Sequence, residues 1–184
     1  MNSFDFPIPT DHAPGGWHAA YAEVYEPLFK KFTDHDKSVR VLEIGTDGGG
    51  GLASYCHYFY NQDRKIYGVD ISECPAWMVG HPRITHFQRD AYTEEFFQFL
   101  KSTHTFHIAL DDGSHQLGHQ EFFCQHYPHL LTQDGIAIVE DIAEHAHIAH
   151  LAKFVPPEFF CYGIDLTMHD GGRYDNRLMV IHRK

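Results

Sequence analysis

Short apolar runs recur along the chain, and longer stretches with apolar residues at helical spacing separate them. Runs that are apolar on both faces are typical of buried strands in a parallel sheet. Seven strands are expected, over residues 39–44, 65–70, 84–88, 106–110, 135–139, 159–166 and 178–181. Five helices are expected, over residues 17–32, 52–60, 93–101, 117–131 and 142–153. This alternation predicts an α/β fold with a doubly wound, mostly parallel sheet.

Two local features refine this prediction. Pro128 lies inside the fourth expected helix and weakens its second half, because proline removes a backbone donor. The last two strands are expected to form a hairpin across a turn at residues 170–172. The fold class is therefore a seven-stranded α/β sheet with a terminal antiparallel strand.

Acidic residues follow two of the expected strands. Asp111 and Asp112 come directly after the fourth strand, in the sequence DDGSH, and Glu140 and Asp141 follow the fifth. In open α/β sheets, ligands bind outside the carboxyl ends of the strands, where these carboxylates would meet. Helix capping explains one acid in each loop but not four together. Clustered carboxylates repel one another unless a cation or protons intervene, so the cluster favours a bound cation. Glu140 and Asp141 can face one ion only if the strand ends before them.

His115 ends the DDGSH segment and is the candidate general base. A positioned imidazole can remove the proton of a substrate hydroxyl. The alternative is that His115 only hydrogen-bonds the backbone at a helix start. His119, four residues further on, would lie near it if the helix begins early, and is a second candidate.

A glycine-rich turn, residues 45–51 (GTDGGGG), follows the first strand. Asp70 ends the second strand, where an acidic residue usually bonds the ribose hydroxyls of a bound nucleotide. A pyrophosphate would be repelled by Asp47, which stands where a dinucleotide-binding turn has its second glycine. S-adenosylmethionine has no phosphate and carries positive charge, so a pocket with Glu43, Asp47 and Asp70 favours it.

Composition limits the partners. The 184 residues suit one domain, 1–184, with residues 1–36 as an N-terminal helical cap segment. A net charge of -11 disfavours a nucleic-acid partner. No apolar stretch approaches the ~18 residues of a membrane span, and the N-terminus does not resemble a signal peptide. The four cysteines are scattered, which favours free thiols. We expect a cytoplasmic protein that handles small molecules, with homo-oligomerisation left open.

Several segments together resemble a known family. They are residues 21–29 (YAEVYEPLF), 41–45 (VLEIG), 68–71 (GVDI), 111–115 (DDGSH) and 139–142 (VEDI). The chain resembles class I S-adenosylmethionine-dependent methyltransferases, and specifically metal-dependent macrolide-sugar O-methyltransferases and cephalosporin hydroxylase-type proteins. The DDGSH and Glu-Asp pairing is the specific part, whereas the glycine turn is generic. The resemblance implies a Rossmann-like methyltransferase sheet.

The resemblance also implies site residues. Asp112, Glu140 and Asp141 would surround a Mg²⁺ ion, and His115 would be the base. Asp90 stands where the family contacts adenine. The donor contacts so expected are Glu43, Gly45, Thr46, Asp47, Asp70, Ile71, Asp90, Ala91, Asp111 and Tyr21. Asp111 is expected to face the amino group of the methyl donor or to cap the loop.

The predicted function is Mg²⁺-dependent transfer of a methyl group from S-adenosylmethionine to a hydroxyl of a small molecule. The resemblance suggests a sugar or a glycosylated natural product as the acceptor. Two alternatives remain open: an NAD-dependent oxidoreductase, and a non-catalytic nucleotide-binding domain of the same fold.

Overall fold

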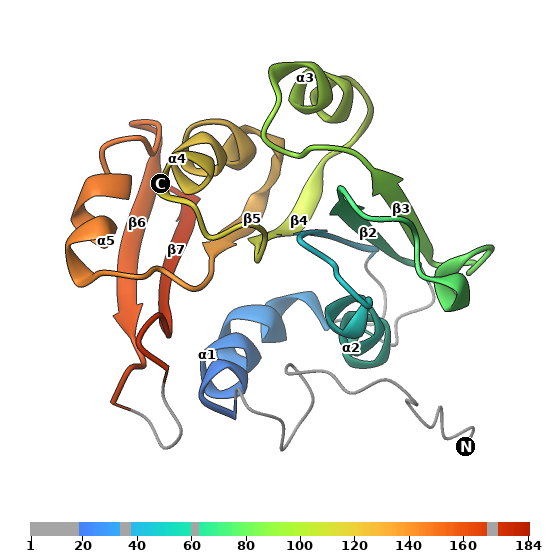
Figure 1. Ribbon diagram of the computed structural model, residues 1–184, viewed down its shortest axis with the longest axis horizontal. Helices are drawn as coiled ribbons and strands as arrows, with labels where there is room; N and C mark the ends of the chain where they lie inside the picture. Colours follow the sequence, from blue (N-terminus) through green and yellow to red (C-terminus); the bar gives the residue numbers. More distant parts are fainter. Residues whose placement is uncertain (1–18, 34–37, 60–62, 169–172) are drawn as a thin grey trace.

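The computed structural model describes residues 19–33, 38–59, 63–168 and 173–184, and Figure 1 shows their arrangement. Most of the expected cap segment and the hairpin turn at residues 170–172 lie outside the described residues. The other elements expected from the sequence can be compared with the structure.

The strands form one seven-stranded sheet in the order β3-β2-β1-β4-β5-β7-β6. β1 to β5 are parallel, and β7 runs antiparallel to both of its neighbours. The predicted fold class is therefore confirmed, with the last strand of the sequence inserted between β5 and β6. The strands are β1 Val39–Ile44, β2 Arg64–Asp70, β3 Ile84–Gln88, β4 Phe106–Asp111, β5 Leu131–Val139, β6 Phe159–Asp165 and β7 Arg177–Arg183.

Helices cover both faces of this sheet. α1 and α2 lie on one face, and α3, α4 and α5 lie on the other (Figure 1). The α-helices are α1 Ala19–Phe29, α2 Gly50–Tyr58, α3 Glu94–Thr103, α4 Leu117–His126 and α5 His145–Leu151. Short 3-10 helices are η1 Lys30–Phe32, η2 Ala76–Met78 and η3 Tyr127–Leu130.

The core follows the alternation of side chains along the strands. In β5, Ile136 and Ile138 belong to the apolar cluster that includes the aromatic residues of α1 and α2. Ala137 and Val139 belong to the cluster that includes those of α3 and α4. Burial on both faces explains why these strands read as continuous apolar runs.

Several element boundaries differ from the sequence prediction by a few residues, among them those of α4, α5 and β4. α4 ends at His126, and the chain continues as a 3-10 helix that contains Pro128, because proline cannot donate to a preceding turn. α5 begins at His145 instead of residue 142, because the backbone N–H of Ile142 donates to the carbonyl oxygen of Arg177 in β7 at 3.1 Å. β4 extends to Asp111, so that this carboxylate belongs to the strand and is buried.

The carboxyl ends of the central strands are level. Ile44 of β1 pairs with Asp111 of β4, and Asp111 pairs with Val139 of β5. The strand order reverses between β1 and β4, where open α/β sheets bind their ligands. The turns after β1, β4 and β5 therefore meet at one edge of the sheet.

Candidate active site

The glycine-rich turn after β1 is held by Asp70, the last residue of β2. Its Oδ2 atom accepts the backbone N–H groups of Thr46 and Asp47 at 2.9 and 3.0 Å. Its Oδ1 atom accepts the N–H of Ser72 at 2.8 Å. Burial alone would raise the pKa of Asp70, but these donors outweigh it and hold the pKa below its usual value. Asp70 therefore organises the turn where the donor is expected to bind.

Gly45 brings this turn against the loop after β4. Its φ is 81°, and a Cβ atom there would lie 2.0 Å from the carbonyl oxygen of Asp112. The N–H of Asp112 also donates to the carbonyl oxygen of Ile44 at 3.0 Å. The two loops are thus packed backbone against backbone, and only glycine fits at position 45.

Glu43 is buried in β1, with 2% of its surface exposed. A Cβ atom on Gly51 would lie 2.1 Å from Glu43 Oε1, so the carboxylate packs directly on the first turn of α2. The positive end of the helix dipole favours an anion in that place. Glu43 therefore lies beneath the turn, instead of being displayed on the surface.

Three further residues that were expected to contact the methyl donor lie in different environments. Ile71 follows Asp70 and is 75% exposed, which places an apolar side chain beside the turn. Asp90 is exposed and lines a cavity of about 580 Å³ between β3 and α3, where its Oδ1 accepts the N–H of Tyr92 at 2.9 Å. Ala91 is buried, and its carbonyl oxygen accepts the hydroxyl of Tyr127 at 2.7 Å.

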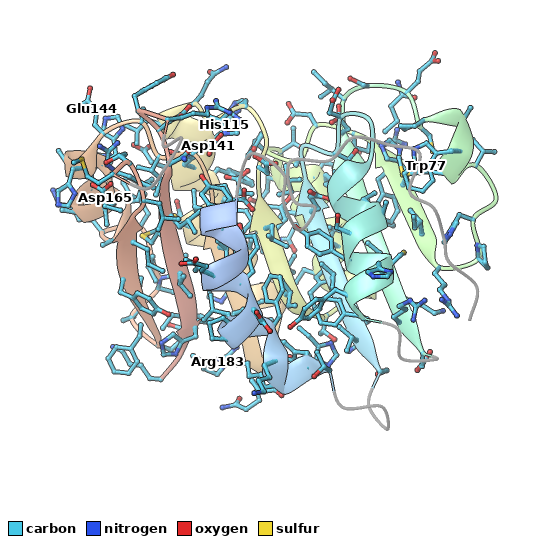
Figure 2. All side chains as sticks on the ribbon, turned by 90° about the horizontal axis from the view of Figure 1, so that it is seen from below. Trp77, His115, Asp141, Glu144, Asp165 and Arg183 are labelled. Carbon is cyan, nitrogen blue, oxygen red and sulfur yellow. The ribbon has the colours of Figure 1, made fainter. Side chains whose placement is uncertain are left out.

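Three side chains at this edge could hold a metal ion together, namely those of Asp112, His115 and Asp141. One ligand atom from each lies within 4.8 Å of the others. Figure 2 shows His115 and Asp141 side by side at one end of the sheet, opposite the end where Arg183 lies. Both have left-handed backbones, with φ of 55° and 50°. Such a conformation is uncommon outside glycine and is held in place by its surroundings.

Glu140 lies next to this cluster. Because β5 ends at Val139, Glu140 and Asp141 no longer alternate as strand residues, which meets the condition set for both to face one site. Among the described residues, however, Glu140 is not part of the group within 4.8 Å. Its carboxylate is 1% exposed and accepts the hydroxyl of Tyr25, and its backbone carbonyl accepts the amide of Gln120 at 3.1 Å.

α1 contributes a second tyrosine to the acidic edge. The hydroxyl of Tyr21 donates to Asp141 Oδ1 at 2.6 Å. Burial, followed by the charges of Glu140 and Asp141, raises the pKa of Tyr21 well above its usual value. Burial and the charge of Glu140 also raise the pKa of Tyr25. Both hydroxyls therefore stay protonated and serve as donors to the carboxylates.

Asp111 is directed into the protein. It is 2% exposed, and its Oδ1 accepts the hydroxyl of Tyr92 at 2.5 Å. Burial raises the pKa of Asp111 to about 7; the hydrogen bond from Tyr92 lowers it, and the charge of Asp112 raises it further. Within the described part of the chain, its buried Oδ2 has no hydrogen-bond partner.

One curated protein is similar to this chain over most of the chain's length. No family model matches the chain. The 8-demethyl-8-(2-methoxy-alpha-L-rhamnosyl)-tetracenomycin-C 3'-O-methyltransferase of Streptomyces olivaceus is 30% identical over 136 residues, which are 70% of this chain and 33% of that protein. The chain thus matches about a third of this curated relative.

Solved structures are also similar to this chain. MycE methyltransferase from the mycinamycin biosynthetic pathway, in complex with Mg and SAH, has a TM-score of 0.67 and 23% identity. The match covers 94% of this chain and 52% of MycE. TrmN from Thermus thermophilus has a TM-score of 0.60 and 18% identity, over 86% of this chain and 48% of TrmN. The chain has the class I methyltransferase fold. The resemblance stated from the sequence is confirmed at this level.

The class I methyltransferase fold explains which predicted residues meet. The glycine turn and the acidic loops share one edge of the sheet, so Gly45, Asp70, Asp112, His115 and Asp141 come together. Glu43 and Asp111 lie deeper, and Ala91 is part of the core. In the described part of the chain, no helix has the length and apolar character that crossing a membrane requires.

Sequence reasoning missed three contributors to the site. Tyr92 and Gln120 reach Asp111 and Glu140 only through tertiary packing. Arg173 places a guanidinium nitrogen 3.9 Å from Asp141 Oδ2. No local pattern marks these residues, whereas Tyr25 lies in the segment 21–29 that carries part of the family resemblance.

Proposed function

We propose that this chain transfers a methyl group from S-adenosylmethionine to a hydroxyl of a sugar-type small molecule, with the assistance of Mg²⁺. The observation that carries the proposal is the grouping of Asp112, His115 and Asp141 beside the glycine turn. The curated relative is named as a sugar O-methyltransferase, and MycE is described in complex with Mg and SAH. Both support the same chemistry for this chain.

The turn after β1 suits a donor without phosphate. In a dinucleotide site, free backbone N–H groups of this turn bind the pyrophosphate. Here the N–H groups of Thr46 and Asp47 already donate to Asp70. Asp47 itself is exposed and acidic, which favours the positive charges of S-adenosylmethionine and repels a pyrophosphate. These contacts argue against the NAD-dependent alternative.

The acidic edge suits a hard divalent cation. Two carboxylates and an imidazole lie within ligand distance of one another, and two tyrosine hydroxyls keep neighbouring carboxylates in place. Mg²⁺ prefers oxygen ligands and usually keeps open positions for water or substrate. Asp112 and Asp141 would hold the ion, and Glu140, the third ligand expected from the sequence, lies next to them. His115 is then left for proton transfer.

The reaction needs a deprotonated oxygen. A bound Mg²⁺ polarises a hydroxyl and makes it more acidic. The imidazole of His115 accepts the hydroxyl proton. The oxygen lone pair forms the new bond to the methyl carbon, and the electrons of the carbon–sulfur bond return to sulfur, which leaves a neutral thioether. The rigid contact between the donor turn and the acidic loop fixes the relative positions of the two reactants.

Binding measurements test the proposal without knowledge of the acceptor. Isothermal titration calorimetry should show saturable binding of S-adenosylhomocysteine and of Mn²⁺, and no binding of NAD. Asp112→Asn should weaken Mn²⁺ affinity at least about tenfold, because a ligand charge is lost. Asp134→Asn, at the opposite end of β5, is the matched control. Binding of NAD in place of S-adenosylhomocysteine would contradict the proposal.

Turnover tests the base. Methyl α-L-rhamnoside is a simple vicinal-diol acceptor whose methylation can be followed with labelled S-adenosylmethionine. His115→Ala should keep S-adenosylhomocysteine affinity and lose at least about tenfold in turnover. EDTA should abolish turnover, and added Mg²⁺ should restore it. Unchanged turnover in His115→Ala would exclude it as the base.

A further inference from the structure

The loop that carries Asp112 and His115 rests on a stacked pair of rings. Tyr92, which precedes α3, and His119, in the first turn of α4, stack with ring centroids 4.1 Å apart and an interplanar angle of 17°. The sequence suggested His119 only as a spare base. In the structure its Nδ1 atom is 2.6 Å from the hydroxyl of Ser114, the residue before His115.

This ring pair contacts the loop at three points. The Tyr92 hydroxyl donates to Asp111, where the loop begins. A Cβ atom on Gly113 would lie 2.1 Å from the same hydroxyl, so the backbone passes directly over Tyr92. His119 holds Ser114. The loop is thus supported along its length by two aromatic rings.

The hydroxyl of Ser114 can satisfy both of its neighbours at once. The N–H of Gln116 donates to Ser114 Oγ at 3.3 Å, so the oxygen acts as an acceptor there. The hydroxyl proton remains available for Nδ1 of His119. This bond connects Ser114 to α4 directly before His115, whose backbone is left-handed with φ 55°.

We propose that His119 is a positioning residue, which holds the loop of residues 112–115 so that Asp112 and His115 face Asp141 together. This inference rests on the proposed function, because the loop is positioned for metal binding and proton transfer. The contacts of His119 with the loop are independent of that function. Other contacts also hold the loop, namely the bond between Asp112 and Ile44 and the packing of Gly45. Loss of the His119 contact should therefore loosen the loop without detaching it.

Two substitutions of His119 separate positioning from general packing. An asparagine amide lies where Nδ1 of the imidazole lies, whereas a glutamine amide reaches the position of Nε2. His119→Asn can therefore keep the bond to Ser114, and His119→Gln cannot. Ser114→Ala, at an exposed position, removes the same bond and also the acceptor of the Gln116 N–H, so its effect should be at least as large as that of His119→Gln. His126→Ala is the matched control, because His126 lies on the same helix and packs on Phe122 at 4.2 Å.

Two readouts decide the inference. Hydrogen exchange of a peptide that spans residues 112–116, in metal-free protein, should be faster in His119→Gln and Ser114→Ala than in wild type. Mn²⁺ affinity in the same variants should fall about fivefold, the size expected for one hydrogen bond. His119→Asn should stay within about twofold of wild type, and His126→Ala should match wild type. Thermal unfolding checks that each variant is folded.

The failures of the two proposals can be told apart. If wild type binds no Mn²⁺, the proposed function fails, and the exchange rates alone still test the role of His119. If wild type binds Mn²⁺ but His119→Gln and Ser114→Ala retain wild-type affinity and exchange, the positioning role is overturned. Equal losses in His119→Asn and His119→Gln would also overturn it, because the bond to Ser114 would then not be the cause.

Discussion

Asp111 offers a direct thermodynamic test of the buried edge of the site. Burial raises its pKa from 3.8 to about 7. In the pH range between these values, the folded protein keeps a proton that the unfolded chain has released. The free energy of unfolding must then decrease as pH rises, and the decrease ends above about pH 7. Asp111→Asn cannot ionise and removes this contribution.

The size of the effect follows from the raised pKa. One pH unit inside the window is worth about 1.4 kcal/mol, so the full interval amounts to about 4 kcal/mol. Asn introduces a separate cost, because its amide would lie where Oδ2 has no partner among the described residues. That cost is about 1–3 kcal/mol and does not vary with pH. The informative quantity is therefore the pH dependence of the difference between the two proteins.

Urea unfolding at pH 5, 6, 7 and 8, with EDTA present, measures this difference. Asp111→Asn should gain roughly 2–3 kcal/mol relative to wild type between pH 5 and pH 7, and little more at pH 8. Asp134→Asn controls for the loss of one negative charge. A difference that stays constant across the series would mean that Asp111 is ionised throughout, and the reasoning from burial would be refuted.

Two further substitutions test contacts that shape the site. Gly45→Ala should lower the free energy of unfolding by at least about 2 kcal/mol, because the new Cβ would meet a backbone carbonyl at a positive φ, and it should weaken S-adenosylhomocysteine and Mn²⁺ together. Gly118→Ala, where nothing lies within 4 Å of the new Cβ, is its control in the same urea and calorimetry assays; equal effects would refute the close-packing argument. Tyr25→Phe should lose about 1–3 kcal/mol in urea unfolding, since the buried carboxylate of Glu140 loses its hydroxyl donor. Tyr162→Phe, at an exposed tyrosine of β6, should change stability little, and equal losses in the two variants would contradict this reading.

The apolar runs predicted the strands well, because burial on both faces leaves a pattern that is local in the sequence. The apolar runs also predicted where β4 and β5 end, and therefore that the acidic residues after these strands meet at one edge of the sheet. The direction in which each carboxylate points could not be predicted from these runs. Asp111 was expected to face the donor or cap the loop; the structure adds that it extends β4 and accepts the hydroxyl of Tyr92, 19 residues away, which the local sequence did not indicate. Such contacts depend on tertiary packing, and the spacing of residues along the chain does not predict them.

The same limit explains the errors at α4 and α5. Apolar spacing continued past His126, but proline chemistry ended the α-helix there. At α5, the spacing suggested a start at residue 142, whereas the backbone N–H of Ile142 bonds to Arg177 of β7 and the helix begins at His145. The late start of α5 lies beside the acidic edge, whereas the end of α4 leads into the start of β5, at the opposite edge of the sheet.

The tyrosines of α1 have a consequence for how the protein acquires its site. Tyr21 and Tyr25 reach carboxylates that are 120 and 115 positions away in the chain. Contacts at such separation form slowly, because a long loop must close before they repay the loss of chain entropy. The acidic edge is therefore completed only after both halves of the sheet have assembled. The proposed metal site then depends on contacts between distant parts of the chain, and a fragment that lacks α1 would leave two carboxylates without these tyrosine donors.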